Sequence, residues 1–170
     1  TDELTIREIA SKDPPTIAKA FRAQGWNKTQ GQFEKYHLQQ TEGRRTVLIA
    51  EMNGEFVGYL TIVWESDYRP FRDECIPEIV DFNVLMAQQR KGVGTALMDR
   101  AEARISERSK TAGICVGLDA DFGAAQVMYA RRGYMPDGRG IQYDGKQLKF
   151  GDKTTVDYSL CMCFTKKLKQ

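Results

Sequence analysis

Hydrophobic and polar residues alternate in several short segments, which is the pattern of half-buried β-strands. The first of these extends from Leu4 to Ile9. Alternation or short apolar runs predict further strands at 46–52, 56–64, 78–85, 113–118 and 158–165, with another beginning at 134–135. Asn53-Gly54 predicts a two-residue hairpin turn between two of these strands, and Asp144-Gly145 predicts a second hairpin within Ile141–Phe150.

Other segments favour helices. A Pro-Pro pair opens the first predicted helix, which begins at Pro14. Apolar residues recur at helical spacing in the three other predicted helices, at 29–40, 95–108 and 124–132. Around the third helix, apolar residues recur every four positions and form one stripe, consisting of Val93, Leu97, Ala101 and Ile105. The charged segment Glu65–Ile76 is expected to be an irregular loop.

The order of these elements along the chain is β, α, α, β, β, β, α, β, α, β, β. Strands joined by hairpins occur beside strands joined through helices, and that mixture requires one mixed sheet covered by helices. We find no internal repeat and no low-complexity linker. The sequence therefore predicts a single domain over residues 1–170.

Composition and charge exclude several classes of function. The chain has 170 residues, of which 41% are hydrophobic and 28% charged, as in an ordinary globular protein. Its net charge of +2 gives no overall attraction to nucleic acid or to an anionic membrane. No apolar run approaches the ~18 residues of a membrane span, and the first residues lack the pattern of a signal peptide. We therefore expect a cytoplasmic protein without nucleic-acid or membrane partners.

Four cysteines occur in the chain, at Cys75, Cys115, Cys161 and Cys163. Their spacing matches neither a C-x-x-C pair nor a disulfide framework. Because the chain contains a single histidine, a structural zinc site is not expected either. We therefore expect reduced thiols, no metal, and a role for Cys115 as a small buried hydrophobe.

The clearest chemical motif is the segment Gln89–Gly94, which follows a predicted strand and precedes a predicted helix. A helix start presents backbone N–H groups and the positive end of its dipole. Gly92 and Gly94 let the backbone approach an anion closely, while Arg90 and Lys91 add positive charge. The arrangement suits a pyrophosphate.

The residues of this motif leave other interpretations open. A P-loop is excluded because G-x-x-x-x-G-K-[ST] does not occur. A dinucleotide fingerprint fits poorly, since Leu97 occupies the place of its third glycine, although Asp119 does end the next strand. The motif is also compatible with a basic turn that binds no ligand.

Two segments of the sequence resemble the GNAT superfamily of acetyl-CoA-dependent N-acetyltransferases. The pattern Q-x-x-G-x-G from Gln89 to Gly94 resembles motif A of that family, and Ala125–Tyr134 resembles motif B, A-x-x-x-Y-x-x-x-G-[FY]. The element order also resembles the family's fold over most of the chain. The resemblance implies an α/β (α+β) fold with a mixed, mostly antiparallel, twisted central sheet flanked by about four helices.

The resemblance also implies roles for individual residues. Acetyl-CoA would be the co-substrate, with no metal, and the acceptor a primary amine of a small molecule or peptide, acetylated directly in a ternary complex. Tyr129 would protonate the leaving thiolate. Cofactor contacts are expected from the strand end, the glycine loop and the motif B helix, at Phe82, Val84, Gln89, Arg90, Lys91, Gly92, Val93, Gly94, Thr95 and Ala125. A homodimer through an edge strand is compatible with this fold.

The expected general base is Glu78, which lies eleven residues before Gln89, the interval found in the histone-acetylating branch of the family. Burial should raise the pKa of its carboxyl group. Asp81 is the second candidate and should point to the opposite face of the strand, while ordered water is a third. A non-catalytic CoA-binding sensor on the same fold is the alternative function.

The sequence departs from the family pattern in two places. Phe122 stands where the family often has an asparagine that helps to hold the pantetheine arm or its fold. The connection Pro136–Asp157 is longer than the family minimum. The resemblance therefore leaves the role of Phe122 open, and the long connection is a candidate to shape the acceptor site.

Overall fold

A computed structural model describes residues 1–169, in which eight strands and five α-helices are divided between two units. The first unit consists of Thr1–Trp64 and Ile79–Arg104, and the second of Glu65–Glu78 and the residues from Ile105 onward. The paired strands with known register are antiparallel. These elements confirm the predicted mixed α/β class.

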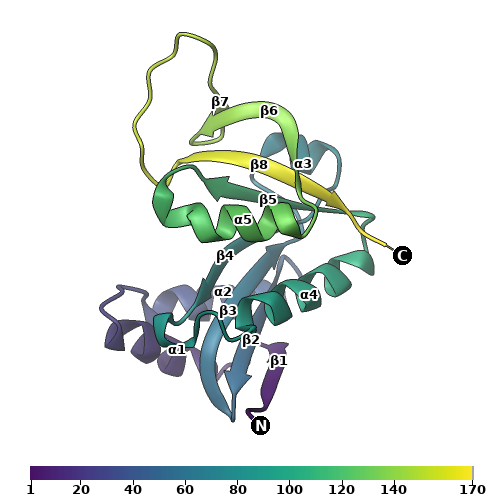
Figure 1. Ribbon diagram of the computed structural model, residues 1–170. Helices are drawn as coiled ribbons and strands as arrows, with labels where there is room; N and C mark the ends of the chain where they lie inside the picture. The colour runs from purple at the N-terminus through teal and green to yellow at the C-terminus, as the bar shows by residue number, and fades with distance from the viewer. Residues whose placement is uncertain (170) are drawn as a thin grey trace. The chain divides into compact units, whose positions relative to one another are not determined.

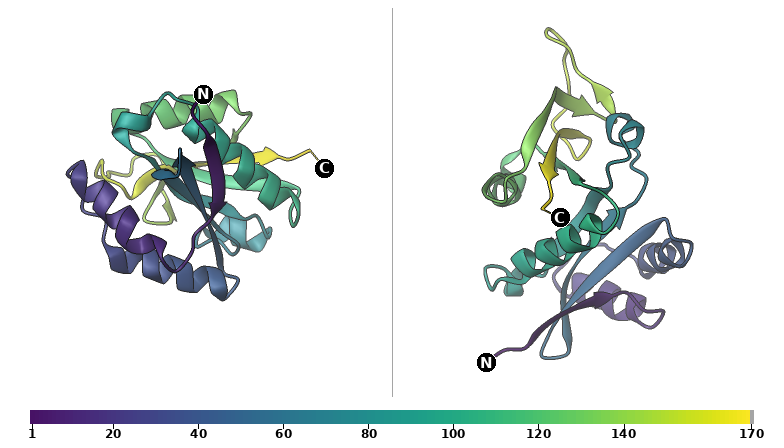
Figure 2. Two further views of the ribbon diagram at one scale, coloured as in Figure 1. Left: turned by 90° about the horizontal axis from the view of Figure 1, so that it is seen from below. Right: turned by 90° about the vertical axis from the view of Figure 1, so that its right-hand side faces the viewer.

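The first unit is built on the strand order β1-β2-β3-β4 (Figure 1). Its strands are β1 (Leu4–Glu8), β2 (Arg45–Met52), β3 (Glu55–Val63) and β4 (Glu78–Val84), whose first residue belongs to the second unit. Its helices are α1 (Asp13–Ala23), α2 (Gln30–Thr41) and most of α4 (Val93–Ser106), preceded by a 3-10 turn at Met86–Gln88. Helices α1 and α2 lie on one side of β2 and β3, and α4 on the other (Figure 2).

The core of the first unit lies between α1, α2 and the strands beneath them. Phe21 of α1, Phe33 of α2 and Tyr59 of β3 are fully buried. Their rings stack or meet edge to face, with centroids 5.2–6.5 Å apart. On the opposite side, all four residues of the predicted α4 stripe, Val93, Leu97, Ala101 and Ile105, are buried. That prediction is confirmed.

The second unit has the strand order β5-β8-β6-β7. Its strands are β5 (Thr111–Gly117), β6 (Met135–Tyr143), β7 (Lys146–Gln147) and β8 (Leu160–Lys167). Its helices are α3 (Arg69–Asp73) and α5 (Gly123–Arg131), and a 3-10 turn at Ala120–Phe122 leads into α5. Helices α3 and α5 cover opposite faces of these strands (Figures 1 and 2).

Most predicted elements are present, and their turns follow the predicted chemistry. Asn53-Gly54 and Asp144-Gly145 both have positive φ at each residue, and each joins the antiparallel strands expected. The expectation of an irregular loop over Glu65–Ile76 was wrong in one part, because α3 forms there as a fifth helix. Pro70 lies in its first turn, where the missing N–H costs nothing. No helix within residues 1–169 is long and apolar enough to cross a membrane.

Candidate functional site

The glycine loop of the first unit ends where α4 begins. The carbonyl oxygen of Gly92 accepts the first helical hydrogen bond from the N–H of Ala96, at 3.0 Å. The N–H groups of the next three residues, Val93, Gly94 and Thr95, therefore have no partner within the helix. Such a helix start can bind an anion through its backbone.

Two residues of this loop adopt left-handed backbone conformations. Arg90 has a φ of 60° and Gly92 a φ of 84°, and the second is a conformation that favours glycine. Two such residues within three positions turn the chain tightly into the helix. Arg90, Lys91 and Gly92 are exposed, so two cationic side chains stand at the open end of α4.

Side chains near the loop tie it to the end of β4. The amide of Gln89 donates to the carbonyl oxygen of Val84 at 3.4 Å, and the Lys91 ammonium donates to Gln88 at 3.2 Å. Phe82 and Val84, the predicted pantetheine contacts, are half-buried in the same unit. The structure thus brings together the candidate residues 82–95, with Gln89 bound to the chain itself.

Asp81 of β4 lies at the centre of a hydrogen-bond network in the first unit. Its Oδ2 accepts from the hydroxyls of Tyr36 (2.9 Å) and Tyr59 (2.7 Å) and from the amide of Gln32 (3.1 Å). Its Oδ1 accepts from the amide of Asn83 at 2.8 Å. The backbone at Asp81 has a φ of 55°, which interrupts the regular alternation of the strand. Asp81 therefore faces α2 and β3.

Lys28 completes this network with a charge. Its ammonium lies 3.3 Å from Oδ1 of Asp81 and 5.6 Å from the ring centroids of both Phe21 and Tyr59. Burial, together with the Asp81 carboxylate, raises the pKa of the Tyr59 hydroxyl far above its usual range. Tyr59 therefore remains a hydrogen-bond donor, and both carboxylate oxygens of Asp81 are saturated.

Glu78, the expected base, is a buried carboxyl group in the second unit. It is 9% exposed, and one oxygen accepts a hydrogen bond from the hydroxyl of Ser66. Ser66 in turn accepts from the N–H of Tyr68 at 3.0 Å. Burial raises the pKa of Glu78, the Ser66 hydrogen bond opposes this, and the nearby Asp67 carboxylate adds to it. The predicted direction of the pKa is confirmed, whereas the catalytic role stays a prediction.

Tyr129, the expected acid, lies on α5 of the same unit and is 6% exposed. Its ring meets that of Tyr134 edge to face, with centroids 6.0 Å apart. Its hydroxyl makes no hydrogen bond to any other residue in the described part of the chain. Burial alone raises its pKa, so the group is a neutral phenol near pH 7. Ala125 lies one helical turn earlier on α5 and is half-buried.

The cysteines correct a sequence-based expectation. Cys115 of β5 and Cys163 of β8 form a disulfide, with Cα atoms 4.0 Å apart, although we expected reduced thiols. The physical reason is register, because these two residues are direct partners across the antiparallel pair. Cys75 and Cys161 are free, and Cys161 is half-buried near the carboxylates of Glu78 and Asp137.

Phe122, which stands in place of the family's frequent asparagine, has a packing role in this chain. A side chain at Gly117 of β5 would collide with its ring, since a Cβ atom there would lie 2.4 Å from it. The ring thus fills the space above this glycine. The long connection Pro136–Asp157 is held near its start by a hydrogen bond, in which Asp137 accepts from the Tyr68 hydroxyl at 2.7 Å.

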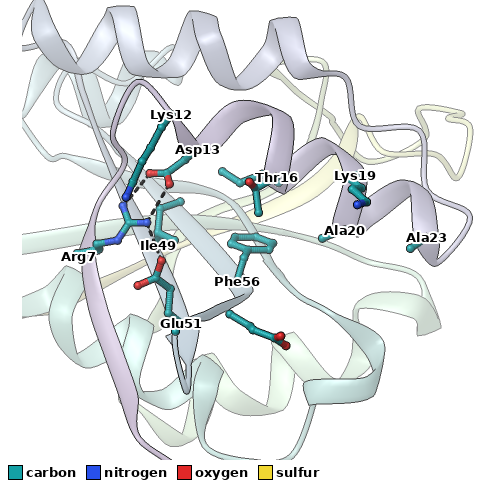
Figure 3. A pocket seen from close by; sticks show the side chains of 13 residues that line it. Arg7, Lys12, Asp13, Thr16, Lys19, Ala20, Ala23, Ile49, Glu51 and Phe56 are labelled. Atoms are coloured by element: carbon teal, nitrogen blue, oxygen red, sulfur yellow. Dashed lines mark hydrogen bonds and ion pairs between the residues drawn. The ribbon is translucent and has the colours of Figure 1, made fainter.

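A cavity of about 540 Å³ in the first unit is lined by none of the predicted site residues. Figure 3 shows Arg7 at one side of it, where the guanidinium donates to Asp13 (2.7 and 2.8 Å) and to Glu51 (2.6 Å). These two carboxylates neutralise Arg7. A second cavity of about 380 Å³ is lined by the α1–α2 connection, including Trp26 and Lys28.

Sequence reasoning missed three functional features of the site. It did not identify Ser66 as the partner of Glu78, the saturation of Asp81, or the disulfide. No local pattern marks the first two, because their partners come from distant segments. Cys161 and Cys163 lie two residues apart in β8, but only the register with β5 shows that Cys115 lies opposite Cys163.

Comparisons with known proteins agree with this arrangement. A family model described as "Acetyltransferase (GNAT) family" matches residues 5–134. Among solved structures, an N-acetyltransferase from Staphylococcus aureus Mu50 is 16% identical, has a TM-score of 0.71, and is matched over 98% of this chain and 99% of its own. A search of curated proteins finds no match.

Two further solved structures have the same fold. A putative acetyltransferase from Salmonella typhimurium, solved with its cofactor acetyl-CoA, is 18% identical with a TM-score of 0.69 and is matched over 98% of this chain and 95% of its own. The ribosomal-protein-S18-alanine N-acetyltransferase from Escherichia coli is 15% identical with a TM-score of 0.69, over 99% of this chain and 96% of its own.

Proposed function

Because the chain belongs to the GNAT acetyltransferase family and is thus an acyltransferase, we propose that it moves an acetyl group from acetyl-CoA to a primary amine. The transfer is direct, within a ternary complex, and the acceptor is a small molecule. A peptide amine is the alternative acceptor.

The start of α4 is the observation that carries this proposal. Three backbone N–H groups without helical partners, at Val93, Gly94 and Thr95, lie beside the exposed cations of Arg90 and Lys91. A pyrophosphate carries the negative charge and the acceptor oxygens that such a helix start binds. These residues therefore fit the pyrophosphate of CoA.

The proposed roles of Glu78 and Tyr129 follow from the protonation state of each side chain. An alkyl amine arrives as an ammonium ion, because such groups titrate near pH ~10. In the proposed mechanism Glu78 removes that proton, directly or through water. Its raised pKa makes it a better proton acceptor than an ordinary carboxylate.

The amine nitrogen then forms a bond to the thioester carbonyl carbon and loses its second proton to solvent, and the carbon–sulfur bond breaks. CoA supplies the activated acetyl group, and Tyr129 donates its hydroxyl proton to the departing sulfur. The neutral phenol that burial maintains is the form this step requires. The Tyr129 phenolate regains a proton from solvent, and the products are the N-acetylated amine, free CoA thiol and one released proton.

An assay that follows free thiol release tests the activity. The protein is mixed with acetyl-CoA and a panel of acceptors that includes small primary amines, amino acids and peptides. Thiol release that depends on one class of amine identifies the acceptor. If no amine stimulates release while CoA still binds, the chain would be a non-catalytic CoA-binding module.

A matched pair of variants tests the cofactor site by calorimetry. Gly94→Glu places a negative charge and bulk in the first turn of α4, and we expect CoA binding to be lost. An acidic residue there suits the helix dipole, so the fold should be kept. Gly31→Glu makes the same change at an exposed position of α2 with open space around it. Unchanged CoA affinity in Gly94→Glu would remove the pyrophosphate assignment.

A further inference from the structure

Three sulfur atoms gather on one face of the strands in the second unit. Cys115 of β5 lies directly opposite Cys163 of β8, and Cys161 precedes Cys163 by two residues. Residues two apart in a strand point to the same face. The Sγ atoms of Cys115, Cys161 and Cys163 all lie within 4.8 Å of one another.

Apolar side chains surround this group. Tyr68, Phe71 and Ile76 pack against Cys163, with Cys115 and Cys161 at the edge of the same cluster. Cys163 is 1% exposed, whereas the other two are half-buried, so the group has a closed side and an open side.

Two glycines of β5 leave space for aromatic side chains near the three sulfur atoms. Gly113 and Gly117 lie two residues on either side of Cys115. A Cβ atom at Gly113 would lie 2.5 Å from the ring of Phe71, and one at Gly117 would lie 2.4 Å from the ring of Phe122. Aromatic rings therefore occupy the places that side chains would take beside Cys115.

We propose that Cys115, Cys161 and Cys163, once the disulfide is reduced, bind a thiophilic d¹⁰ cation such as Zn²⁺ through three thiolates. Tetrahedral zinc with Zn–S bonds of about 2.3 Å requires sulfur atoms roughly 3.8 Å apart. All three sulfur atoms lie within 4.8 Å of one another, so Cys161 is already near this spacing. The sulfur atoms of Cys115 and Cys163 must move apart from bonding distance once the disulfide is reduced. The fourth position is left to water on the open side. This inference does not depend on acetyl transfer.

The chemistry of the ligand set selects the class of cation. Three sulfur donors suit Zn²⁺ or Cu⁺, while Mg²⁺ and Ca²⁺ require oxygen ligands. Thiolate is the form that binds a metal, so the Cys115–Cys163 bond and the cation exclude each other. The oxidised protein should therefore have no such site.

The conversion between the two states balances with a phosphine as reductant. The phosphine breaks the sulfur–sulfur bond and takes one oxygen atom from water to become a phosphine oxide. The two hydrogen atoms of that water end on Cys115 and Cys163 as thiols. Binding of one Zn²⁺ then displaces three protons, one from each cysteine.

Direct metal binding to the whole chain tests the proposal. We expect phosphine-reduced protein to bind one equivalent of Zn²⁺ in competition with a chromophoric chelator. Co²⁺ should give thiolate-to-cobalt charge-transfer absorption at the same stoichiometry. The midpoint of thermal unfolding of the reduced protein should rise with one equivalent of Zn²⁺. Protein with the disulfide intact should show none of these changes.

Two single substitutions separate this site from other thiols. Cys161→Ser removes one ligand but leaves the disulfide partners in place, and we expect zinc affinity to fall at least about hundredfold, as outer-shell losses alone reach that size. Cys75→Ser removes the exposed cysteine in the turn after α3 and should bind zinc as the wild type does. Undiminished binding by Cys161→Ser, loss of binding in Cys75→Ser, or the absence of charge-transfer absorption would each overturn the proposal.

Discussion

Acidic side chains in the two units have very different surroundings. In the first unit, Asp81 accepts four hydrogen bonds from uncharged donors, two of them tyrosine hydroxyls, and pairs with Lys28. In the second unit, Glu78 accepts a single side-chain hydrogen bond from Ser66. Within residues 1–169 the Tyr129 hydroxyl makes no hydrogen bond, whereas the Tyr59 hydroxyl of the first unit donates to Asp81 and accepts from Asn83.

This difference separates a carboxylate that links several elements from acids that have few partners. A carboxylate whose oxygens accept hydrogen bonds from several elements ties those elements together. A buried acid with few partners has a raised pKa, because nothing replaces the water that it lost. Glu78 and Tyr129 are of this second kind, and perturbed groups of this kind are frequent at functional sites.

Removal of the Tyr129 hydroxyl should have the largest effect on activity. We expect Tyr129→Phe to lower turnover by ~10²–10⁴-fold, the contribution of a positioned general acid. The free energy of unfolding should stay nearly unchanged, since the hydroxyl has no hydrogen bond to lose, and CoA affinity should be kept. Steady-state kinetics, urea unfolding and calorimetry measure the three quantities.

Tyr59→Phe is the matched control for that substitution. It removes a buried hydroxyl that holds Asp81, so it should cost about 1 kcal/mol of unfolding free energy. Its turnover should change much less than that of Tyr129→Phe. Wild-type turnover in Tyr129→Phe, under conditions where chemistry limits the rate, would show that water or another group is the acid.

Glu78→Gln should have the next largest effect, a loss of about 10²-fold in rate at neutral pH. A base must be ionised, so the wild-type rate should fall as pH decreases through the raised pKa of Glu78. This acidic limb of the pH–rate profile should flatten in Glu78→Gln, because glutamine does not titrate. An acidic limb that remains unchanged in the variant would exclude Glu78 as the base.

Asp81→Asn should act mainly on stability. An amide cannot accept from all the donors that surround Asp81, and it leaves the Lys28 ammonium without its carboxylate. We expect the free energy of unfolding to fall by about 2 kcal/mol, measured by urea denaturation. Under conditions where Asp81→Asn is still folded, its pH–rate profile should keep the acidic limb of the wild type. Loss of that limb with full stability would reverse the roles assigned to Asp81 and Glu78.

Local chemistry explains which parts of the fold could be predicted from the sequence. The turns at Asn53-Gly54 and Asp144-Gly145 and the stripe on α4 depend on residues close in sequence. A helix after the glycine loop was likewise predicted, from Thr95, whereas α4 begins two residues earlier, at Val93. Helix α3 was missed because five residues are too few to show a helical period.

Long-range pairing explains what could not be predicted. Tyr36 lies 45 residues from Asp81, and Cys115 lies 48 residues from Cys163. Each contact depends on strand register or on how a helix packs, and neither quantity is encoded in a short window. Asp81 was expected on the opposite face from Glu78 by simple alternation, but its left-handed backbone interrupts that pattern. The surroundings of the two candidate bases therefore depend on tertiary contacts that a short stretch of sequence does not contain.

The smallest effect concerns the stability of Glu78→Gln as a function of pH. The folded state raises the pKa of Glu78 above its ordinary value, so the folded protein binds this proton more tightly than the unfolded chain. The cost of the buried charge is therefore fully present above the folded-state pKa and vanishes below the ordinary value near 4.5. Glutamine carries no charge and can still accept the Ser66 hydrogen bond. Glu78→Gln should thus be more stable than the wild type at pH 8, and the difference should shrink as pH falls through that window. Urea, being uncharged, allows both proteins to be unfolded at each pH without screening the carboxylate. A difference that stays constant with pH would mean that folding does not change the pKa of Glu78.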